Sequence, residues 1–194
     1  MTPVDSEDDQ GPFGRPLFDD PSARALSRVG VVDVGSNSVR MVVFDGAARA
    51  YGERYSDPMA AMARIAAKNH ANALANPLAQ MRREMSFEAC NTVTEKNPLI
   101  APPLRLSDCS LISDGAAAVV LSADPAAHAR SAHIRAAVHL SDFLPMSRRD
   151  LLAFEGPKRA VAQAYAQAGV TVADIGFAEV HDCFTIAELL MYEA

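Results

Sequence analysis

The feature that most constrains the fold of this chain is an apolar run that ends in polar, chemically reactive side chains. The run Ile175–Ala178 is followed, after two residues, by the block His181-Asp182-Cys183-Phe184. This pattern is typical of a strand that ends at a chemical site, because open α/β sheets bind ligands at the carboxyl ends of their strands. It predicts an α/β fold with a site near His181, and the remaining groups of that site are expected upstream.

The rest of the sequence alternates predicted helices and strands, as an α/β fold requires. Helical spacing of apolar residues predicts the helices, and continuous apolar runs predict buried strands. The predicted helices cover 58–75, 157–168 and 185–193, and the predicted strands cover 114–121, 133–140 and 175–180. Gly169 ends the second helix, because glycine adopts the left-handed backbone of a helix C-terminus readily.

Composition narrows the class of protein. A length of 194 residues suits one ordinary domain or two small ones. The net charge of −6 argues against a nucleic-acid surface, which needs clustered Lys and Arg, and no apolar run approaches the length of a bilayer span. The three cysteines are irregularly spaced, and no C-x-x-C pair predicts a metal site. We therefore expect a cytoplasmic protein without nucleic-acid or membrane partners.

The composition of the N-terminal part changes near residue 28. Residues 1–27 mix acids, prolines and glycines and are expected to be disordered. Two β-rich runs follow, Val29–Asp33 and Val39–Phe44, and the short polar turn Gly35–Ser38 predicts that they form a hairpin. Such a turn can present backbone N–H groups, hydroxyls and Arg40 to a phosphate, although spacing alone favours a hairpin with ordinary turn residues.

The run Arg28–Gly46 resembles the opening of the exopolyphosphatase and guanosine pentaphosphate phosphohydrolase family. That family has an actin-like ATPase fold, and its first hairpin carries the pattern D-x-G-S-N-S-x-R. The residues that match its phosphate-binding turn are Asp33, Gly35, Ser36, Asn37, Ser38 and Arg40. The later acidic residues and second phosphate loop of the family have no counterpart in this sequence.

A second and longer resemblance covers residues from about 50 to 194. The segments that carry this resemblance are Tyr51–Tyr55, Lys68–His70, Asn76–Gln80, Pro103–Leu106, Asp108–Ser110, Asp114–Ala118, Phe154–Pro157 and the block at His181. Together these segments resemble the thiolase family, and within it the sterol-carrier-protein-x type and its bacterial relatives. The resemblance implies a five-layered αβαβα fold, present here in part. It also implies acyl transfer to and from coenzyme A.

The thiolase resemblance implies roles for a few residues. His181 matches the position that helps to polarise the thioester oxygen in an oxyanion hole. Ser110 matches the serine beside the pantetheine arm, and Phe184 is expected to pack against the catalytic cavity. Asp114 and Gly115 are expected to be structural. A coenzyme A thioester would be a substrate rather than a bound cofactor, and thiolases imply a homo-oligomer.

The departures from the thiolase pattern bear on activity. The nucleophilic cysteine at a helix start, the histidine of a G-H-P motif and the cysteine of C-x-G-G-G are missing from the 194 residues. Cys90, Cys109 and Cys183 lack such contexts and are expected to be inert. The sequence therefore resembles a mosaic: a head (1–27), a phosphatase-like hairpin (28–46), a junction (47–50) and a partial thiolase-like domain (51–194).

Three functions compete at this point. The leading one is a thiolase-like acyltransferase fragment that keeps part of the coenzyme A pocket and is inactive alone. The second is an exopolyphosphatase-type phosphohydrolase, which depends on the hairpin and Arg40. The third is a non-catalytic module that binds acyl-CoA or a partner. A partial thiolase sheet would expose apolar faces and strand edges, so marginal stability or aggregation is expected.

Overall fold

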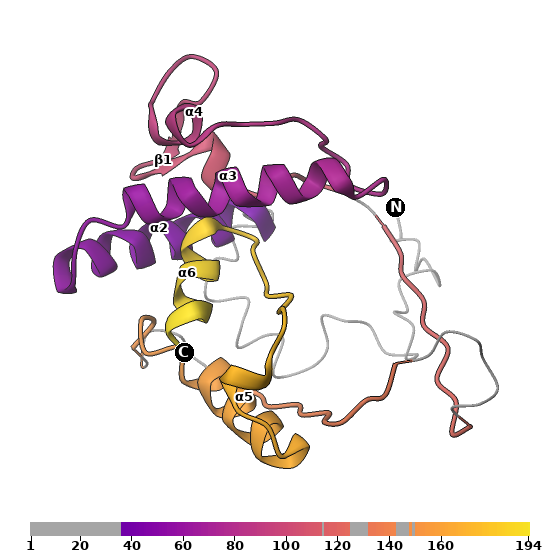
Figure 1. The fold of residues 1–194 in the computed structure, drawn as a ribbon. Helices are drawn as coiled ribbons and strands as arrows, with labels where there is room; N and C mark the ends of the chain where they lie inside the picture. Colours follow the sequence, from indigo (N-terminus) through magenta and orange to yellow (C-terminus); the bar gives the residue numbers. More distant parts are fainter. Residues whose placement is uncertain (1–35, 114, 125–131, 143–147, 149) are drawn as a thin grey trace, which may run out of the picture. The chain divides into compact units, whose positions relative to one another are not determined.

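The computed structural model describes residues 36–113, 115–124, 132–142, 148 and 150–194. The chain divides into two compact units, residues 1–40 and 41–194. Only the beginning of one helix is described in the first unit. The elements, in chain order, are α2 (Ser36–Arg54), α3 (Met59–Ala75), α4 (Phe87–Asn91), β1 (Leu99–Ala101), β2 (Leu104–Arg105), η1 (Leu106–Asp108), α5 (Glu155–Ala168), η4 (Val172–Asp174) and α6 (Thr185–Glu193) (Figure 1).

Helix α2 replaces the second half of the predicted hairpin. The predicted turn at residues 36–38 and the predicted strand 39–44 are wrong, because residues 36–54 form one continuous helix. Strand propensity of valines is a weak preference that tertiary packing overrides. Here Ala47, Ala48 and Tyr51 are buried at helical spacing on one face of α2. The predicted first strand, 29–33, and the predicted head, 1–27, lie outside the described residues.

The three predicted helices are confirmed, with small shifts at their ends. Helix α3 begins after Pro58 and buries Met62, Ala63, Ile65 and Ala66, which lie on one face. Helix α5 ends at Gly169, whose φ of 65° is the left-handed conformation expected there. None of the described helices is long and apolar enough to cross a membrane.

The sheet is much smaller than the sequence predicts. In the described residues it consists of β1 and β2, which pair antiparallel with Leu99 opposite Arg105. The predicted strands 114–121, 133–140 and 175–180 are wrong where they are described, because those residues form no strand. A buried central strand exists only when neighbouring strands and covering layers are present. Those neighbours are not supplied by the described residues, so Val120 and Phe177 are exposed instead.

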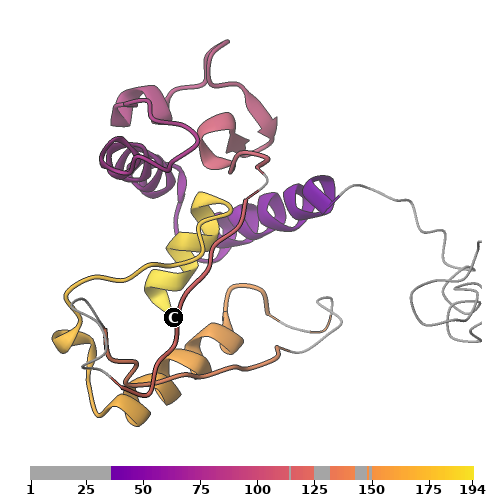
Figure 2. The same ribbon diagram turned by 90° about the vertical axis from the view of Figure 1, so that its right-hand side faces the viewer.

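The main core lies where α6 packs beside α2 and α3 (Figures 1 and 2). Its buried members are Ala47, Ala48, Tyr51, Met62, Leu104, Leu152, Cys183, Phe184, Ile186, Ala187 and Leu190. The rings of Phe44 and Phe184 stack with centroids 4.7 Å apart, which ties the start of α6 to α2. A smaller cluster of Ala63, Ala66 and Cys90 joins α3 to α4. These contacts fix the C-terminal block against the middle of the chain.

Candidate functional site

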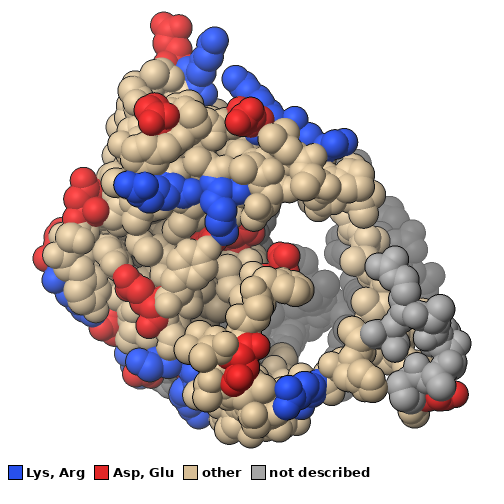
Figure 3. Space-filling model, in the orientation of Figure 1, with Lys and Arg blue, Asp and Glu red and all other residues tan. Residues whose placement is uncertain are grey.

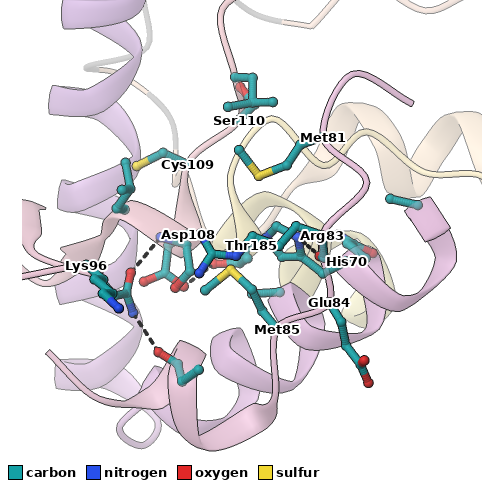
Figure 4. A pocket seen from close by; sticks show the side chains of 18 of the residues that line it. His70, Met81, Arg83, Glu84, Met85, Lys96, Asp108, Cys109, Ser110 and Thr185 are labelled. Carbon is teal, nitrogen blue, oxygen red and sulfur yellow. Dashed lines mark hydrogen bonds between the residues drawn. The ribbon is translucent and has the colours of Figure 1, made fainter. Parts of the chain in front are cut away.

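A pocket of about 820 Å³ lies between α3, the segment after it, η1 and the start of α6 (Figure 4). Its apolar lining includes Ala66, Met81, Met85, Leu106 and Leu111. Its polar lining includes Asn69, His70, Arg83, Glu84, Lys96, Asp108, Ser110, Asp182 and Thr185. A pocket with an apolar lining and a few convergent polar groups is the usual form of a small-molecule site.

Two distant sequence motifs meet at this pocket through one backbone contact. Cys109 and Phe184 form an isolated antiparallel bridge, and the N–H of Ser110 donates to the carbonyl of Cys183 at 3.0 Å. Ser110 and Asp182 consequently line the same pocket. The sequence resemblance named both motifs as parts of one site, and the structure brings Asp108, Cys109 and Ser110 of the first motif and Asp182 of the second to the same cavity.

The floor of the pocket is a buried polar network centred on Asp108. The Nε of Arg105 donates to Oδ2 of Asp108 at 2.9 Å, and the Thr185 hydroxyl donates to Oδ1 at 2.9 Å. The backbone N–H of Arg105 also donates to Oδ2 at 2.9 Å. Arg105 and Asp108 are each 1% exposed. Both carboxylate oxygens of Asp108 thus accept hydrogen bonds from the protein, and these bonds hold this part of the pocket lining in place.

A second network joins α3 to α6 beside the pocket. The Nδ2 of Asn69 lies 2.7 Å from Oε2 of Glu188 and 3.2 Å from Oδ2 of Asp182, so one amide contacts both carboxylates. The ammonium of Lys68 and the hydroxyl of Tyr192 also donate to Glu188, which is 1% exposed. Asn69 therefore connects the buried carboxylate of Glu188, on α6, to Asp182, which lines the pocket just before α6 begins.

The pKa of Glu188 reflects this network. Burial acts first and raises the pKa of its carboxyl, but hydrogen bonds from Lys68, Tyr192 and Asn69 outweigh burial and hold it below its ordinary value. Glu188 is therefore an anion at neutral pH. Sequence reasoning used Lys68–His70 only as matching text. The apolar face of α3 could have located these residues from the sequence. Its buried positions face the core, and Lys68 and Asn69 continue that side of the helix toward α6.

The rim of the pocket carries exposed charges of both signs. Arg83, Glu84 and Lys96 are exposed, and His70 Nδ1 lies 3.0 Å from the carbonyl oxygen of Arg83. Figure 3 shows Lys and Arg side chains, with Asp and Glu side chains among them, in the upper part of the view, where α3 and the segment after it lie. An anionic group on a ligand would find cations at this rim, while its apolar part would contact Met81 and Met85.

The residues to which the thiolase resemblance assigned roles differ in how deeply they are buried. Ser110 lines the pocket, whereas Phe184 is 5% exposed and stacks on Phe44 in the core. His181 is exposed and is not among the described side chains that line the cavity. Its neighbour Asp182 does line it. The oxyanion-hole role of His181 and the cavity role of Phe184 remain predictions.

The phosphatase-type residues fall at the edge of the described chain. Asp33 and Gly35 lie outside the described residues. Ser36, Asn37, Ser38 and Arg40 belong to the first turns of helix α2. The structure therefore replaces the predicted turn with helix at four of the six matching positions, and phosphate binding by these residues remains a prediction.

The cysteine nearest the site is poorly suited to attack a thioester. Cys109 lines the pocket, and burial, reinforced by the charge of Asp108, raises the pKa of its thiol to about 11. Burial likewise raises the pKa of Cys90, and Cys183 is buried in the core. Because the thiolate is the reactive form, Cys109 is almost entirely in its unreactive form at neutral pH.

Alkylation of Cys109 should show this high pKa directly. We expect its rate of reaction with iodoacetamide to keep rising with pH beyond pH 9, since the thiolate fraction still grows there. Peptide mass spectrometry after timed labelling measures the rate at this residue. In urea the same thiol should level off near pH 9, as an ordinary cysteine does. Levelling near pH 9 in the folded protein would contradict the assignment.

Comparison with known proteins supports one family. Residues 139–194 match the thiolase C-terminal domain-like family. An acetyl-CoA acetyltransferase of Methanothermobacter thermautotrophicus is 36% identical over 152 residues, which cover 75% of this chain and 38% of that protein. Human sterol carrier protein 2 is 29% identical over 171 residues, covering 83% of this chain and 30% of that protein.

A third relative is a benzoylsuccinyl-CoA thiolase subunit of Thauera aromatica, which is 31% identical over 138 residues. That alignment covers 68% of this chain and 34% of the relative. The chain spans about a third of the length of these curated relatives. Residues 139–194 are thus similar to the thiolase C-terminal domain-like family, and most of this chain is similar to part of each of these relatives.

Proposed function

We propose that this chain binds a coenzyme A thioester in the pocket at Ser110 and does not transfer the acyl group by itself. The observation that carries the proposal is the bridge between Cys109 and Phe184, which joins the two thiolase-type motifs at one cavity. The printed names of the relatives, which include acetyl-CoA acetyltransferases and a CoA thiolase subunit, support the choice of ligand.

Three features of the site suit the three parts of such a ligand, which are its phosphates, its pantetheine arm and its thioester. The exposed cations Arg83 and Lys96 can pair with phosphates, because both carry permanent or near-permanent positive charge at neutral pH. The apolar lining can take the pantetheine arm, and Ser110 offers a hydroxyl near its amides. His181 lies next to Asp182 in the chain but outside the lining of the pocket, and its proposed role, the stabilisation of negative charge on the thioester oxygen, comes from the family resemblance alone.

The absence of acyl transfer is expected from the cysteines. A thiolase reaction needs a thiolate that attacks the thioester carbon, with a base to receive its proton. Among the described residues, the cysteine that lines the pocket is Cys109, whose thiol has a pKa of about 11. His181 would then stabilise a charge that none of the described residues lining the pocket creates.

Calorimetric titration of the full chain with coenzyme A tests the proposal. Ser110→Trp should fill the pocket mouth and weaken binding at least tenfold, about 1.4 kcal/mol. Ser56→Trp is the matched control, because Ser56 is exposed between α2 and α3 and does not line the pocket, and it should bind as the parent does. Equal affinity in all three proteins would contradict the assignment of the site.

A thiol-release assay with acetyl-CoA tests the catalytic part. We expect no release of free coenzyme A above background, and no change on His181→Ala. Thioester-dependent release that His181→Ala abolishes would overturn the inactive part while leaving the binding site in place. Binding and turnover are measured separately, so each part of the proposal can fail without the other.

A further inference from the structure

Asp182 places a carboxylate in the pocket close to Ser110. The N–H of Ser110 donates to the carbonyl of Cys183, the residue after Asp182, at 3.0 Å. Ser110 and Asp182 both line the pocket, and the side chain of Asp182 is exposed rather than packed in the core. A group of a ligand that lies at Ser110 is therefore also near this carboxylate.

Asn69 of α3 holds this carboxylate in place. The Nδ2 atom of Asn69 donates to Oδ2 of Asp182 at 3.2 Å and to Oε2 of Glu188 at 2.7 Å. Glu188 is buried on α6, so the amide of Asn69 is itself fixed by a side chain that cannot move into solvent. The hydrogen bond from Asn69 therefore keeps the carboxylate of Asp182 at the wall of the pocket.

No cation of the described chain is paired with Asp182. The ion pairs among the described residues involve other carboxylates, and Lys68, the neighbour of Asn69, pairs with Glu188. The partner that the structure gives Asp182 is the neutral amide of Asn69. An anionic ligand group at this wall would thus meet a like charge without a counter-charge, and such repulsion over a few ångströms is enough to weaken binding about tenfold.

We propose that Asp182 selects against acyl groups that carry a carboxylate, so that the pocket takes thioesters with uncharged acyl groups. This inference rests on the proposed function, in which a coenzyme A thioester binds at Ser110 and its acyl group reaches the wall beside Asp182. An uncharged acyl chain can contact Leu111, the lining residue that follows Ser110. A second carboxylate would instead stay beside Asp182 without a partner, and such a repulsive element gives specificity.

Calorimetric titration of the full chain with propionyl-CoA and with malonyl-CoA tests the proposal. These thioesters differ only at the end of the acyl group, which is a methyl in the first and a carboxylate in the second. We expect the parent chain to bind malonyl-CoA about tenfold more weakly than propionyl-CoA. Asp182→Asn should bring the two affinities close together, because the amide keeps the shape of the side chain without its charge. Asp182→Glu keeps the charge and should keep most of the difference.

Glu53→Gln is the matched control, because it also removes one negative charge, from an exposed side chain of α2 outside the pocket lining. It should distinguish the two thioesters as the parent does. Equal or tighter binding of malonyl-CoA by the parent would overturn this inference and leave the proposed function intact, and this comparison requires no variant to fold. A difference that Asp182→Asn leaves unchanged would also overturn it. A parent that binds neither thioester would overturn the proposed function as well.

Discussion

Arg105→Met is expected to lower the free energy of unfolding of the residue 41–194 unit by about 3–5 kcal/mol, which is the usual cost of breaking a buried ion pair. Arg105 is 1% exposed and donates to Asp108, to Asn91 and to the carbonyl of Met59. Its loss leaves the carboxylate of Asp108 without its counter-charge in the core. Urea unfolding followed by circular dichroism measures the change.

Two further variants distinguish the cost of breaking the buried ion pair from a general effect of losing an arginine. Arg159→Met removes an exposed arginine of α5 and should cost less than about 0.5 kcal/mol. The double variant Arg105→Met with Asp108→Asn removes both charges and should recover part of the loss, since no lone ion stays buried. Equal unfolding midpoints for Arg105→Met and Arg159→Met would contradict the role of the pair.

Glu188→Ala is the variant with the second large expected effect. It should lower the free energy of unfolding by about 2–3 kcal/mol at pH 7. Glu188 is 1% exposed, and the variant removes the carboxylate that accepts from Lys68 and Asn69, so that Lys68 loses its counter-charge on α6. The cost is smaller than that of Arg105→Met, because the side chain of Lys68 is 46% exposed and can regain water. The measurement is urea unfolding of parent and variant at several pH values.

The pH dependence of this loss has a definite sign. The pKa of Glu188 is held below its ordinary value in the folded chain, so its stabilisation is fully present above the ordinary pKa and is lost as pH falls through the folded one. The difference between parent and Glu188→Ala should therefore shrink in acid, below about pH 4.5. Glu53→Ala, an exposed control on α2, should show no such trend. A constant difference across pH would contradict the assignment.

The sequence predicted α3, α5 and α6 because helical signals are local, but it predicted a hairpin where the first part of α2 lies. Spacing of apolar residues located α3, α5 and α6, and Gly169 marked the end of α5. Strands were predicted poorly, because a strand depends on partners elsewhere in the chain. The runs at 114–121 and 175–180 carry strand composition, yet their described residues have no neighbouring strand and stay extended and exposed.

The candidate site was predictable only in part. Motif resemblance located Ser110 and the block at His181, and the structure adds that Ser110 and Asp182 line one pocket. The network of Lys68, Asn69 and Glu188 was missed, since it joins residues 119 positions apart that share no motif. Such contacts follow from the docking of α6 on α3, which local patterns do not specify.

The bridge between Cys109 and Phe184 has a consequence for how the pocket can vary. It closes a loop of about 75 residues, and the entropic cost of closing a flexible loop rises only by about 0.6 kcal/mol when its length doubles. The two ends are held by Asp108, Thr185 and the core around Phe184, all adjacent to the bridge. Insertions between them, placed away from Leu111 in the pocket lining and Leu152 in the core, should thus leave the pocket walls in place at small thermodynamic cost.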